Sequence, residues 1–220
     1  MSALVLRTCA ADMTSYGGRF RWPESGPVAA PDWSPDPVCG GGLHGLLWGE
    51  GDGELLSWDA NARWLVVEIP DGSWADIGLK VKFPRGVVVF CGDRKSATDY
   101  LAARAPGHEI VGGTATAGVG GTATAGDMGT ATAGDMGTAT AGRGGRATAG
   151  YMGTATAGDM GTATAGVGGT ATAGDGGILL LQWWDGRRHC IAKVYVGEGG
   201  IEAGVPYRCD GGKAVRVVQS

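Results

Sequence analysis

Cys39 and His44 are residues of the N-terminal half whose types could serve a metal ion or a nucleophilic reaction. They lie in the glycine-rich stretch VCGGGLHG, and Cys9 or Cys91 could complete a zinc site with them. Zinc sites usually contain close pairs such as C-x-x-C, and this sequence has none. A thiol and an imidazole alone fix no catalytic geometry. We therefore interpret both as structural residues and predict no catalytic residue, no metal site and no cofactor.

Aspartates recur at one position of an eight-residue repeat, at Asp127, Asp135, Asp159 and Asp175. Calcium-binding β-rolls also carry a repeated Asp, but they place it in a tighter G-G-x-G-x-D phrase with several carbonyl ligands per ion. Here the Asp is missing from half of the octads. We interpret these residues as parts of solvated turns, with calcium binding as a minor alternative.

Threonines form a regular series of hydroxyl side chains. Residues 114–177 contain one octad eight times with few changes, as in TATAGDMG at residues 122–129. The T-A-T-A half has the period-two alternation of a strand, and the glycines supply turn residues. Exact repetition indicates one small unit stacked on itself. Because the simplest closed coil uses two octads, we predict a β-solenoid of four coils, about 19 Å tall at about 4.8 Å per coil.

Other structures compete with this one. Collagen-like packing requires glycine at every third position, whereas these glycines are three and five positions apart. A disordered linker rich in glycine and alanine would not keep a strict period. A coil of one or three octads would keep the period and remains an alternative.

Arg146 replaces the first threonine of one octad and indicates which side of the strand faces outward. An arginine does not fit in a core just wide enough for alanines. Because side chains alternate along a strand, we predict both threonines of each octad outside and both alanines inside. The flexible methionines of the turns could fold over the ends of this thin core; they are Met128, Met136, Met152 and Met160.

Residues 1–108 are predicted to form a small α+β domain. Apolar runs bounded by Gly, Pro or Asp predict strands at residues 65–69, 79–81 and 87–91. A short helix is expected to follow, with Asp93 or Ser96 as its cap and Pro106-Gly107 as its stop. We place the repeat domain at residues 109–177.

Residues 178–220 are predicted to form a β cap. In the stretch ILLLQWWDGRRHCIAKVYV, Asp185-Gly186 separates two apolar runs, which is a strong hairpin signal. A solenoid needs a cap so that the edge of its last coil does not pair with other chains. The overall fold class is therefore mainly β.

Composition restricts the partners and the compartment. The formal net charge of −4 argues against a nucleic-acid binder, which would normally present a basic face. No apolar run is long enough for a membrane helix, and no secretory signal is evident at the start. The five cysteines are odd in number and widely spaced, which favours reduced thiols. We expect a cytoplasmic protein that binds neither nucleic acid nor membrane.

Most of the tryptophans crowd the N-terminal third of the chain: Trp22, Trp33, Trp48, Trp58, Trp64 and Trp74. Core packing of a small domain is the ordinary explanation. An exposed subset could instead bind a partner or a glycan. That hypothesis fails if all six are buried.

The octad AGDMGTAT, at residues 125–132, resembles the A-G-Y-G-S-T-Q-T octapeptide of bacterial ice nucleation proteins. The resemblance implies a β-solenoid whose T-x-T arrays order water, as T-x-T arrays also do in insect antifreeze proteins. The family carries dozens of octads, because nucleation needs a large surface. Eight threonines in alternate octads would then form one uninterrupted face: Thr122, Thr124, Thr138, Thr140, Thr154, Thr156, Thr170 and Thr172.

The flanking segments have resemblances of their own. VCGGGLHG, together with DIGLKVKFPRGVVVFCGDRKSATDYL, is similar to an uncharacterised domain of bacterial and phage proteins. The tail around WWDGRRHCIAKVYVGEGG looks like a cap that follows such octads. Neither resemblance implies an activity.

Two functions are compatible with these patterns. The first is a non-enzymatic structural or interaction protein built around a rigid Thr/Ala/Gly solenoid, whose partner is a second copy or another protein. The alternative is an ice-binding protein that uses the outward T-x-T arrays, with ice as the partner.

Overall fold

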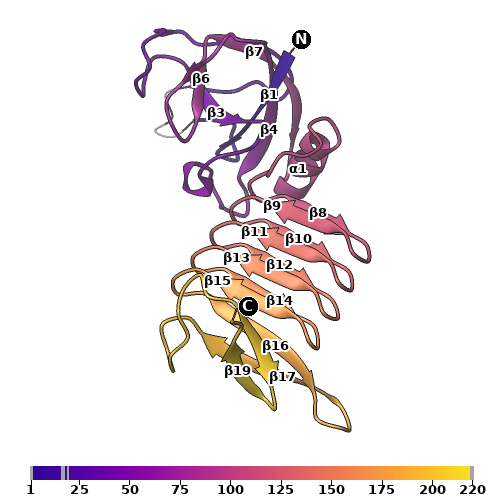
Figure 1. The fold of residues 1–220 in the computed structure, drawn as a ribbon. Helices are drawn as coiled ribbons and strands as arrows, with labels where there is room; N and C mark the ends of the chain where they lie inside the picture. The colour runs from indigo at the N-terminus through magenta and orange to yellow at the C-terminus, as the bar shows by residue number, and fades with distance from the viewer. Residues whose placement is uncertain (1, 16–17, 19, 219–220) are drawn as a thin grey trace. The chain divides into compact units, whose positions relative to one another are not determined.

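The computed structural model describes residues 2–15, 18 and 20–218. Its chain forms two compact units, residues 1–113 and 114–220. In Figure 1 the first unit runs from indigo to magenta and the second from pink to yellow.

The first unit is a seven-stranded antiparallel sheet with strand order β2-β7-β4-β1-β3-β6-β5. A short 3₁₀ helix, η1 (Gly53–Leu55), and an α-helix, α1 (Arg94–Ala102), accompany it. The strands are β1 (Ser2–Cys9), β2 (Gly26–Ala29), β3 (Leu43–Leu47), β4 (Arg63–Pro70), β5 (Ala75–Asp76), β6 (Val81–Phe83) and β7 (Arg85–Gly92).

The central strands β1 and β4 are buried on both faces. Successive residues point to opposite sides of a strand. In β4, Leu65 and Val67 belong to one apolar cluster, whereas Trp64 and Val66 belong to a second one. Helix α1 contributes Leu101 to the second cluster. The sheet therefore separates two cores, and this explains the nearly continuous apolar sequence of its middle strands.

The predicted strands at residues 65–69 and 87–91 are confirmed within β4 and β7. The prediction for residues 79–81 is wrong. Leu79 is 62 % exposed in a bend after Gly78, whose φ is 96°, and the strand starts only at Val81. The apolar side chain of Leu79 suggested a strand, but the chain has not yet joined the sheet at that point.

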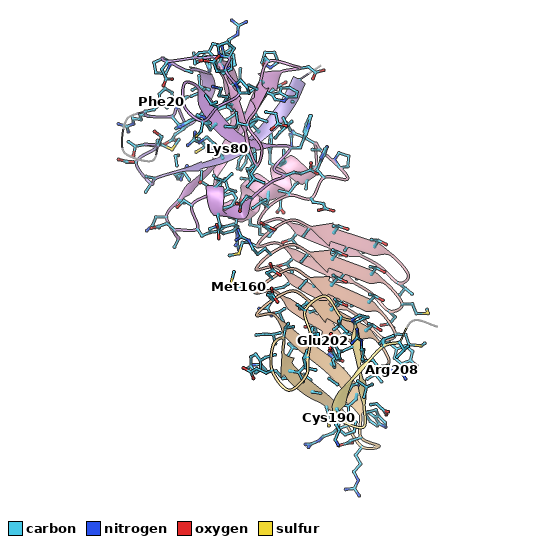
Figure 2. All side chains as sticks on the ribbon, turned by 60° about the vertical axis from the view of Figure 1, so that its left-hand side comes forward. Phe20, Lys80, Met160, Cys190, Glu202 and Arg208 are labelled. Atoms are coloured by element: carbon cyan, nitrogen blue, oxygen red, sulfur yellow. The ribbon has the colours of Figure 1, made fainter. Side chains whose placement is uncertain are left out.

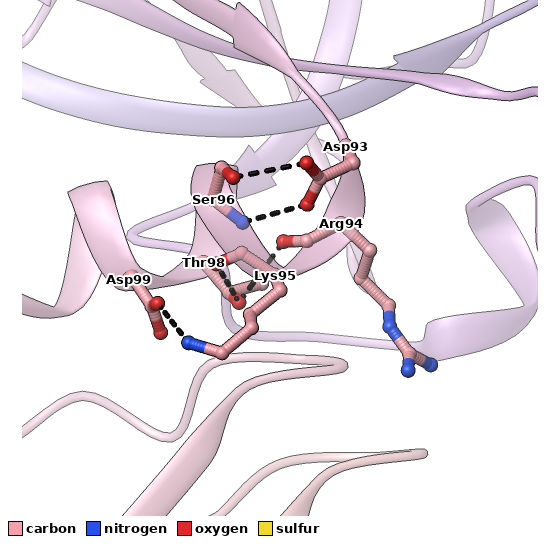
Figure 3. A network of polar contacts seen from close by, with 6 residues as sticks. All are labelled: Asp93, Arg94, Lys95, Ser96, Thr98 and Asp99. Atoms are coloured by element: carbon pink, nitrogen blue, oxygen red, sulfur yellow. Dashed lines mark hydrogen bonds and ion pairs between the residues drawn. The ribbon is translucent and has the colours of Figure 1, made fainter.

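Helix α1 begins as the sequence predicts. The Asp93 side chain is the N-cap, accepting hydrogen bonds from the Ser96 backbone N–H (2.9 Å) and hydroxyl (3.0 Å), as Figure 3 shows. These bonds satisfy one of the N–H groups that a helix start leaves without an intrahelical partner. The helix ends at Ala102, before Pro106.

The second unit is a β-solenoid with two octads per coil, as the repeat predicts. Thr130 pairs in parallel with Thr114 on one side and with Arg146 on the other. Odd and even octads therefore stack as two separate sheets (Figure 1). The strands are β8 (Thr114–Ala117), β9 (Thr122–Ala125), β10 (Thr130–Ala133), β11 (Thr138–Ala141), β12 (Arg146–Ala149), β13 (Thr154–Ala157), β14 (Thr162–Ala165) and β15 (Thr170–Ala173).

The interior of the coils is made of alanine methyl groups. From Ala123 to Ala173 the inward alanines are at most 3 % exposed, as the alternation predicts. The glycine before each strand is equally constrained by space. A Cβ on Gly153 would lie 2.8 Å from the Cβ of Ala149 and 2.9 Å from the carbonyl oxygen of Gly137. The octad therefore keeps glycine where neighbouring coils touch.

The predicted cap is present as two hairpins. Strand β16 (Ile178–Trp184) continues the parallel stack beside β14, and β17 (His189–Tyr195) returns antiparallel to it after the Asp185-Gly186 turn. Strands β18 (Tyr207–Asp210) and β19 (Lys213–Arg216) extend the other sheet from β15. Larger side chains from this region, including Leu179, Leu181 and Tyr207, pack in the same core as the alanines.

Candidate functional site: the threonine faces of the solenoid

The eight threonines predicted as a binding face all lie on one sheet, formed by β9, β11, β13 and β15. We call this surface the Thr122 face; it consists of Thr122, Thr124, Thr138, Thr140, Thr154, Thr156, Thr170 and Thr172. The pairing is in register, so that Thr138 lies between Thr122 and Thr154, and Thr170 follows. Thr122 and Thr154 are exposed, and the other six threonines are partly exposed. Their role in binding remains a prediction.

The Thr122 face has a simple lattice. Threonines in neighbouring coils are about 4.8 Å apart, and the two threonines of one strand are about 6.7 Å apart. The backbone holds this spacing, because Thr138 N–H donates to the Gly121 carbonyl and Thr154 N–H to the Gly137 carbonyl, each at 2.9 Å. Within the described part of the chain, the eight hydroxyls make no side-chain hydrogen bond to protein. They are available to solvent.

The opposite sheet carries a less regular surface, the Arg146 face. It consists of Thr114, Thr116, Thr130, Thr132, Arg146, Thr148, Thr162 and Thr164 on β8, β10, β12 and β14. Arg146 is exposed, as predicted, and it stands between Thr130 and Thr162. Beyond Thr162 the column continues into Ile178 of the cap. A long charged side chain therefore interrupts the threonines of this face.

The turn aspartates join successive coils, a role that the sequence analysis missed. The Oδ1 atom of Asp127 accepts a hydrogen bond from the Arg143 N–H (2.8 Å). Asp135 accepts one from Tyr151 N–H (2.9 Å), and Asp159 one from Asp175 N–H (2.9 Å). Each bond spans one complete coil. The recurrence of Asp at one octad position is visible in the sequence. The N–H group that donates to each Asp can be identified only once the number of residues per coil is known.

The methionines do not cover the alanine core, so that prediction is wrong. Met128, Met136, Met152 and Met160 have φ angles of 54–55° and are 43–66 % exposed. In this left-handed conformation the third turn residue directs its side chain away from the coil. Figure 2 shows Met160 at the edge of the stack, outside the coils.

The zinc grouping considered for Cys39, His44, Cys9 and Cys91 is not formed. Cys39 and His44 line a cavity of about 530 Å³ in the first unit, together with Arg7 and Lys80. Burial, followed by the charge of Lys80, lowers the pKa of His44. Its Nε2 accepts a hydrogen bond from Gly40 N–H (3.5 Å). In the described residues, the imidazole has neither a thiol nor a carboxylate as a hydrogen-bond partner.

The tryptophans are divided between core and partly exposed positions. Trp22 and Trp64 are each only 2 % exposed. The other four, Trp33, Trp48, Trp58 and Trp74, are partly exposed. The hypothesis that a subset binds a partner or a glycan thus stays a prediction.

Comparison with known proteins relates the chain to bacterial ice nucleation proteins. It is 44 % identical to the ice nucleation protein of Xanthomonas campestris pv. translucens over 105 residues, which cover 47 % of this chain and 7 % of that protein. The match to an ice nucleation protein of Pseudomonas syringae is 48 % over 107 residues, covering 46 % and 9 %. That to ice nucleation protein InaU of Pantoea ananas is 40 % over 100 residues, covering 44 % and 10 %.

These matches have clear bounds. The chain spans about a tenth or less of the length of the relatives it matches. The aligned segments are nevertheless longer than the octad run at residues 114–177, so the similarity extends beyond the repeat. No family model matches the chain, and no solved structure matches it. In the described residues, no helix is long and apolar enough to cross a membrane.

The sequence similarity and the fold both relate the repeat to those of ice nucleation proteins. The matched proteins are ice nucleation proteins, and residues 114–181 form a solenoid of about four turns with outward threonines. The chain is a β-solenoid repeat protein whose repeats resemble those of ice nucleation proteins.

Proposed function

We propose that the Thr122 face binds ice, or orders a layer of water molecules into an ice-like arrangement. The observation that carries this proposal is the uninterrupted array of outward threonines on four strands in register. Each threonine presents a methyl group and a hydroxyl at fixed spacing. The ice nucleation proteins among the relatives support the same reading. The Thr122 face is favoured over the Arg146 face because no long side chain protrudes from it.

The rigidity of the coils supports this function. A surface that already holds its binding geometry loses less conformational entropy on binding than a flexible one. Each Thr122-face strand is hydrogen-bonded to its neighbours in the stack, and the turn aspartates add further links. β-Branched threonines are also restricted at χ1. Few degrees of freedom therefore remain to be ordered when ice binds.

The small size of the face limits what it can do. Four coils at about 4.8 Å give a lattice only about 19 Å long. An ice nucleus must be stabilised over a large area, whereas an existing crystal can be bound by a small patch. We therefore expect ice shaping and inhibition of recrystallisation, with little nucleation by the single chain.

Matched double variants test the proposal. Thr138→Tyr with Thr154→Tyr places two bulky groups in the middle of the Thr122 face. Thr130→Tyr with Thr162→Tyr makes the same change at the same octad position of the Arg146 face. We expect the first variant to abolish the shaping of ice crystals in a thin-film microscope and the second to leave it nearly intact. Far-UV circular dichroism and Tm establish that both remain folded.

Other outcomes would contradict the proposal. If both variants lose activity equally, the Thr122 face is not the specific binding surface. If the parent protein neither shapes ice nor inhibits recrystallisation, ice binding is wrong. The solenoid is then better explained as a rigid, non-enzymatic structural or interaction module whose partner is a second copy or another protein. Backbone hydrogen bonds between the short coils would make such a module rigid. Size-exclusion chromatography with light scattering tests self-association directly.

A further inference from the structure

An arginine interrupts the apolar face of the central strand β1. Ala3, Val5 and Cys9 of this strand belong to one apolar core cluster of the first unit. Because side chains at every second position of a strand point to the same side, Arg7 lies on that same face. A charged group in apolar surroundings loses hydration, which costs free energy unless another group compensates. Burial accordingly lowers the pKa of Arg7 to about 10, so the guanidinium still carries its charge at neutral pH.

The protein contacts of Arg7 hold its guanidinium without neutralising it. The Nε and Nη2 atoms donate to the Thr8 carbonyl at 3.2 and 3.1 Å, and Nη1 donates to the His44 carbonyl at 3.2 Å. The guanidinium also stacks on Trp22, with Cζ 4.1 Å from the ring centroid. A guanidinium has five N–H groups, so one on Nη1 and one on Nη2 have no hydrogen-bond partner in the described residues. Among those residues, no carboxylate forms an ion pair with Arg7.

Arg7 lines the cavity of the first unit that also contains Cys39 and His44. The cavity volume, about 530 Å³, lies within the range of small-molecule sites, roughly 300–1,000 Å³. Buried apolar side chains, including Trp22 and Leu46, form part of its wall. A charged group set against apolar walls is typical of sites that bind small molecules, because the polar group orients the ligand and the walls exclude water from it.

The charges around this cavity are mainly positive. Arg7 and Lys80 line it, and Asp32, which is exposed, is the acid among its described lining residues; Figure 2 labels Lys80. Burial lowers the pKa of His44, and three cations lower it further: Lys80, Arg7 and Lys82. Because the imidazole is then neutral at pH 7, the two lining cations exceed the one acid by a single charge. The cavity therefore suits a monoanion.

A glycine-rich loop forms another part of the wall. Gly40 and Gly42 have φ angles of 109° and 144°, which are rare for residues with side chains. Lys82 is 0 % exposed and fixes the loop, because its Nζ donates to the Gly40 carbonyl at 3.0 Å. A Cβ added to Gly40 would have no heavy atom within 4 Å. The loop thus leaves open space beside His44, whose Nε2 accepts a hydrogen bond from the Gly40 N–H.

We propose that this cavity binds an organic carboxylate with an apolar or aromatic body. The two oxygens of the carboxylate accept hydrogen bonds from the N–H groups of Nη1 and Nη2 of Arg7 that no protein group uses, a pairing that the planar guanidinium favours. Lys80 supplies a second positive charge, and the apolar wall contacts the body of the ligand. The bound anion gives Arg7 the counter-charge that the protein itself does not provide. A phosphate dianion matches the balance of charges less well.

A matched series of small ligands tests the proposal on the unmodified chain. 3-Phenylpropionate carries the carboxylate, 3-phenylpropanamide is its neutral counterpart and 3-phenylpropylamine is its cationic one. Binding is followed by nuclear magnetic resonance of the ¹⁵N-labelled protein, through the indole N–H of Trp22, on which Arg7 stacks, and the backbone N–H groups of residues 39–45. We expect saturable binding of 3-phenylpropionate. The amide should bind at least about tenfold more weakly, because hydrogen bonds between charged groups are the stronger ones.

Two matched pairs of variants locate the site. Cys39 is exposed and lines the cavity, whereas its neighbour Val38 is exposed and does not line it. Cys39→Trp should obstruct the cavity and weaken binding of 3-phenylpropionate at least about tenfold, and Val38→Trp should leave it unchanged. Arg7→Gln removes the guanidinium and should weaken binding by a similar factor. Lys95→Gln removes one exposed positive charge from helix α1, outside the cavity, and should have no effect.

Folding is controlled for each variant by Tm and circular dichroism. If Arg7→Gln does not fold, the comparison of the three ligands on the unmodified chain and the Cys39→Trp and Val38→Trp pair still decide the proposal. Absence of saturable binding of 3-phenylpropionate would overturn it, and so would equal affinity for the amide. Equal binding by Cys39→Trp and Val38→Trp would show that the cavity is not the site. Tighter binding of phenyl phosphate than of 3-phenylpropionate would overturn the assignment to a carboxylate.

Discussion

At the residue scale, the turn aspartates connect the coils. A carboxylate that accepts a backbone N–H bond can stabilise a structure by about 1 kcal/mol or more. Asp135 makes such a bond to the coil that follows, through Tyr151 N–H. Asp175 occupies the same octad position in the last coil, where the residue one coil further on, Ile191, already lies in β17. The two aspartates have equal chemistry but different neighbours.

We predict that Asp135→Ala lowers the free energy of unfolding of the solenoid by about 1 kcal/mol, because Tyr151 N–H loses its acceptor. Asp175→Ala is the matched control and should change it by a few tenths of a kcal/mol at most. Urea denaturation monitored by circular dichroism measures both. Equal destabilisation by the two substitutions would show that the carboxylate acts through something other than the inter-coil bond.

Residue-level predictions from the sequence succeeded where local rules decide and failed where the partner is distant. Arg146 could be placed outside because its size and charge exclude it from an alanine core. The role of Asp127 could not be predicted, because its partner lies one coil away and is defined only once the coil length is known. The contact between Cys91 and Met13 joins residues 78 positions apart, and no local pattern announces it.

At the element scale, helix α1 depends on its N-cap. The hydrogen bond from the Ser96 backbone N–H is the first cause of the lowered pKa of Asp93. A carboxyl whose pKa is lower in the folded state stabilises the fold above its unfolded pKa, about 3.9. That stabilisation is lost as the pH falls through the folded value. The first unit therefore becomes less stable on acidification, because the pKa of Asp93 is lower in the folded state than in the unfolded state.

We predict that Asp93→Ala destabilises the first unit by about 1 kcal/mol at pH 7, as the loss of an N-cap typically does. The difference between parent and variant should shrink below about pH 4, where the carboxyl becomes protonated. Tm measured from pH 3 to pH 7 tests this. Asp99→Ala, which removes an exposed i,i+4 partner of Lys95, should have a smaller effect. A difference that grows on acidification would contradict the prediction.

Elements that form a repeat or carry a local signal could be predicted, whereas the sheet of the first unit could not. The hairpin at Asp185-Gly186 follows from its turn residues, and Asp185 accepts hydrogen bonds from Arg187 and Arg188 N–H there. No strand was predicted at residues 2–9, where β1 lies. It is central because β3 and β4 flank it, and these partners lie much further along the chain. Pairing between distant strands leaves no local trace.

At the scale of the whole molecule, the solenoid is modular. Each coil contacts mainly its neighbours in the stack, so stability and surface grow by addition of repeats. The candidate face could be predicted from sequence for this reason: a coil of two octads places alternate octads on one sheet. The boundary between the two units lies at residue 113 in the structure, a few residues after the predicted end of the first domain.

This modularity allows the length of the face to be varied inside the intact protein. Inserting one, two or four copies of residues 130–145 before Arg146 adds whole coils in register. Every copy adds one threonine pair to each sheet, and Arg146 stays on its own face because only complete coils are inserted. We expect each variant to fold, with strand content rising and Tm unchanged or higher, since every new coil brings its own interface. Unfolding on insertion of a single coil would contradict the modular stability argued from the register.

The same series measures how activity depends on the length of the Thr122 face. If this face binds ice, inhibition of recrystallisation should increase with each coil, because the lattice lengthens by about 4.8 Å per copy. The control series carries Thr→Tyr at the first threonine of each octad that contributes to the Thr122 face. This face is therefore blocked at each length. These controls should fold equally well and stay inactive. Folded, longer solenoids with no gain in activity would refute ice binding. The repeat would then serve as a rigid structural or interaction module.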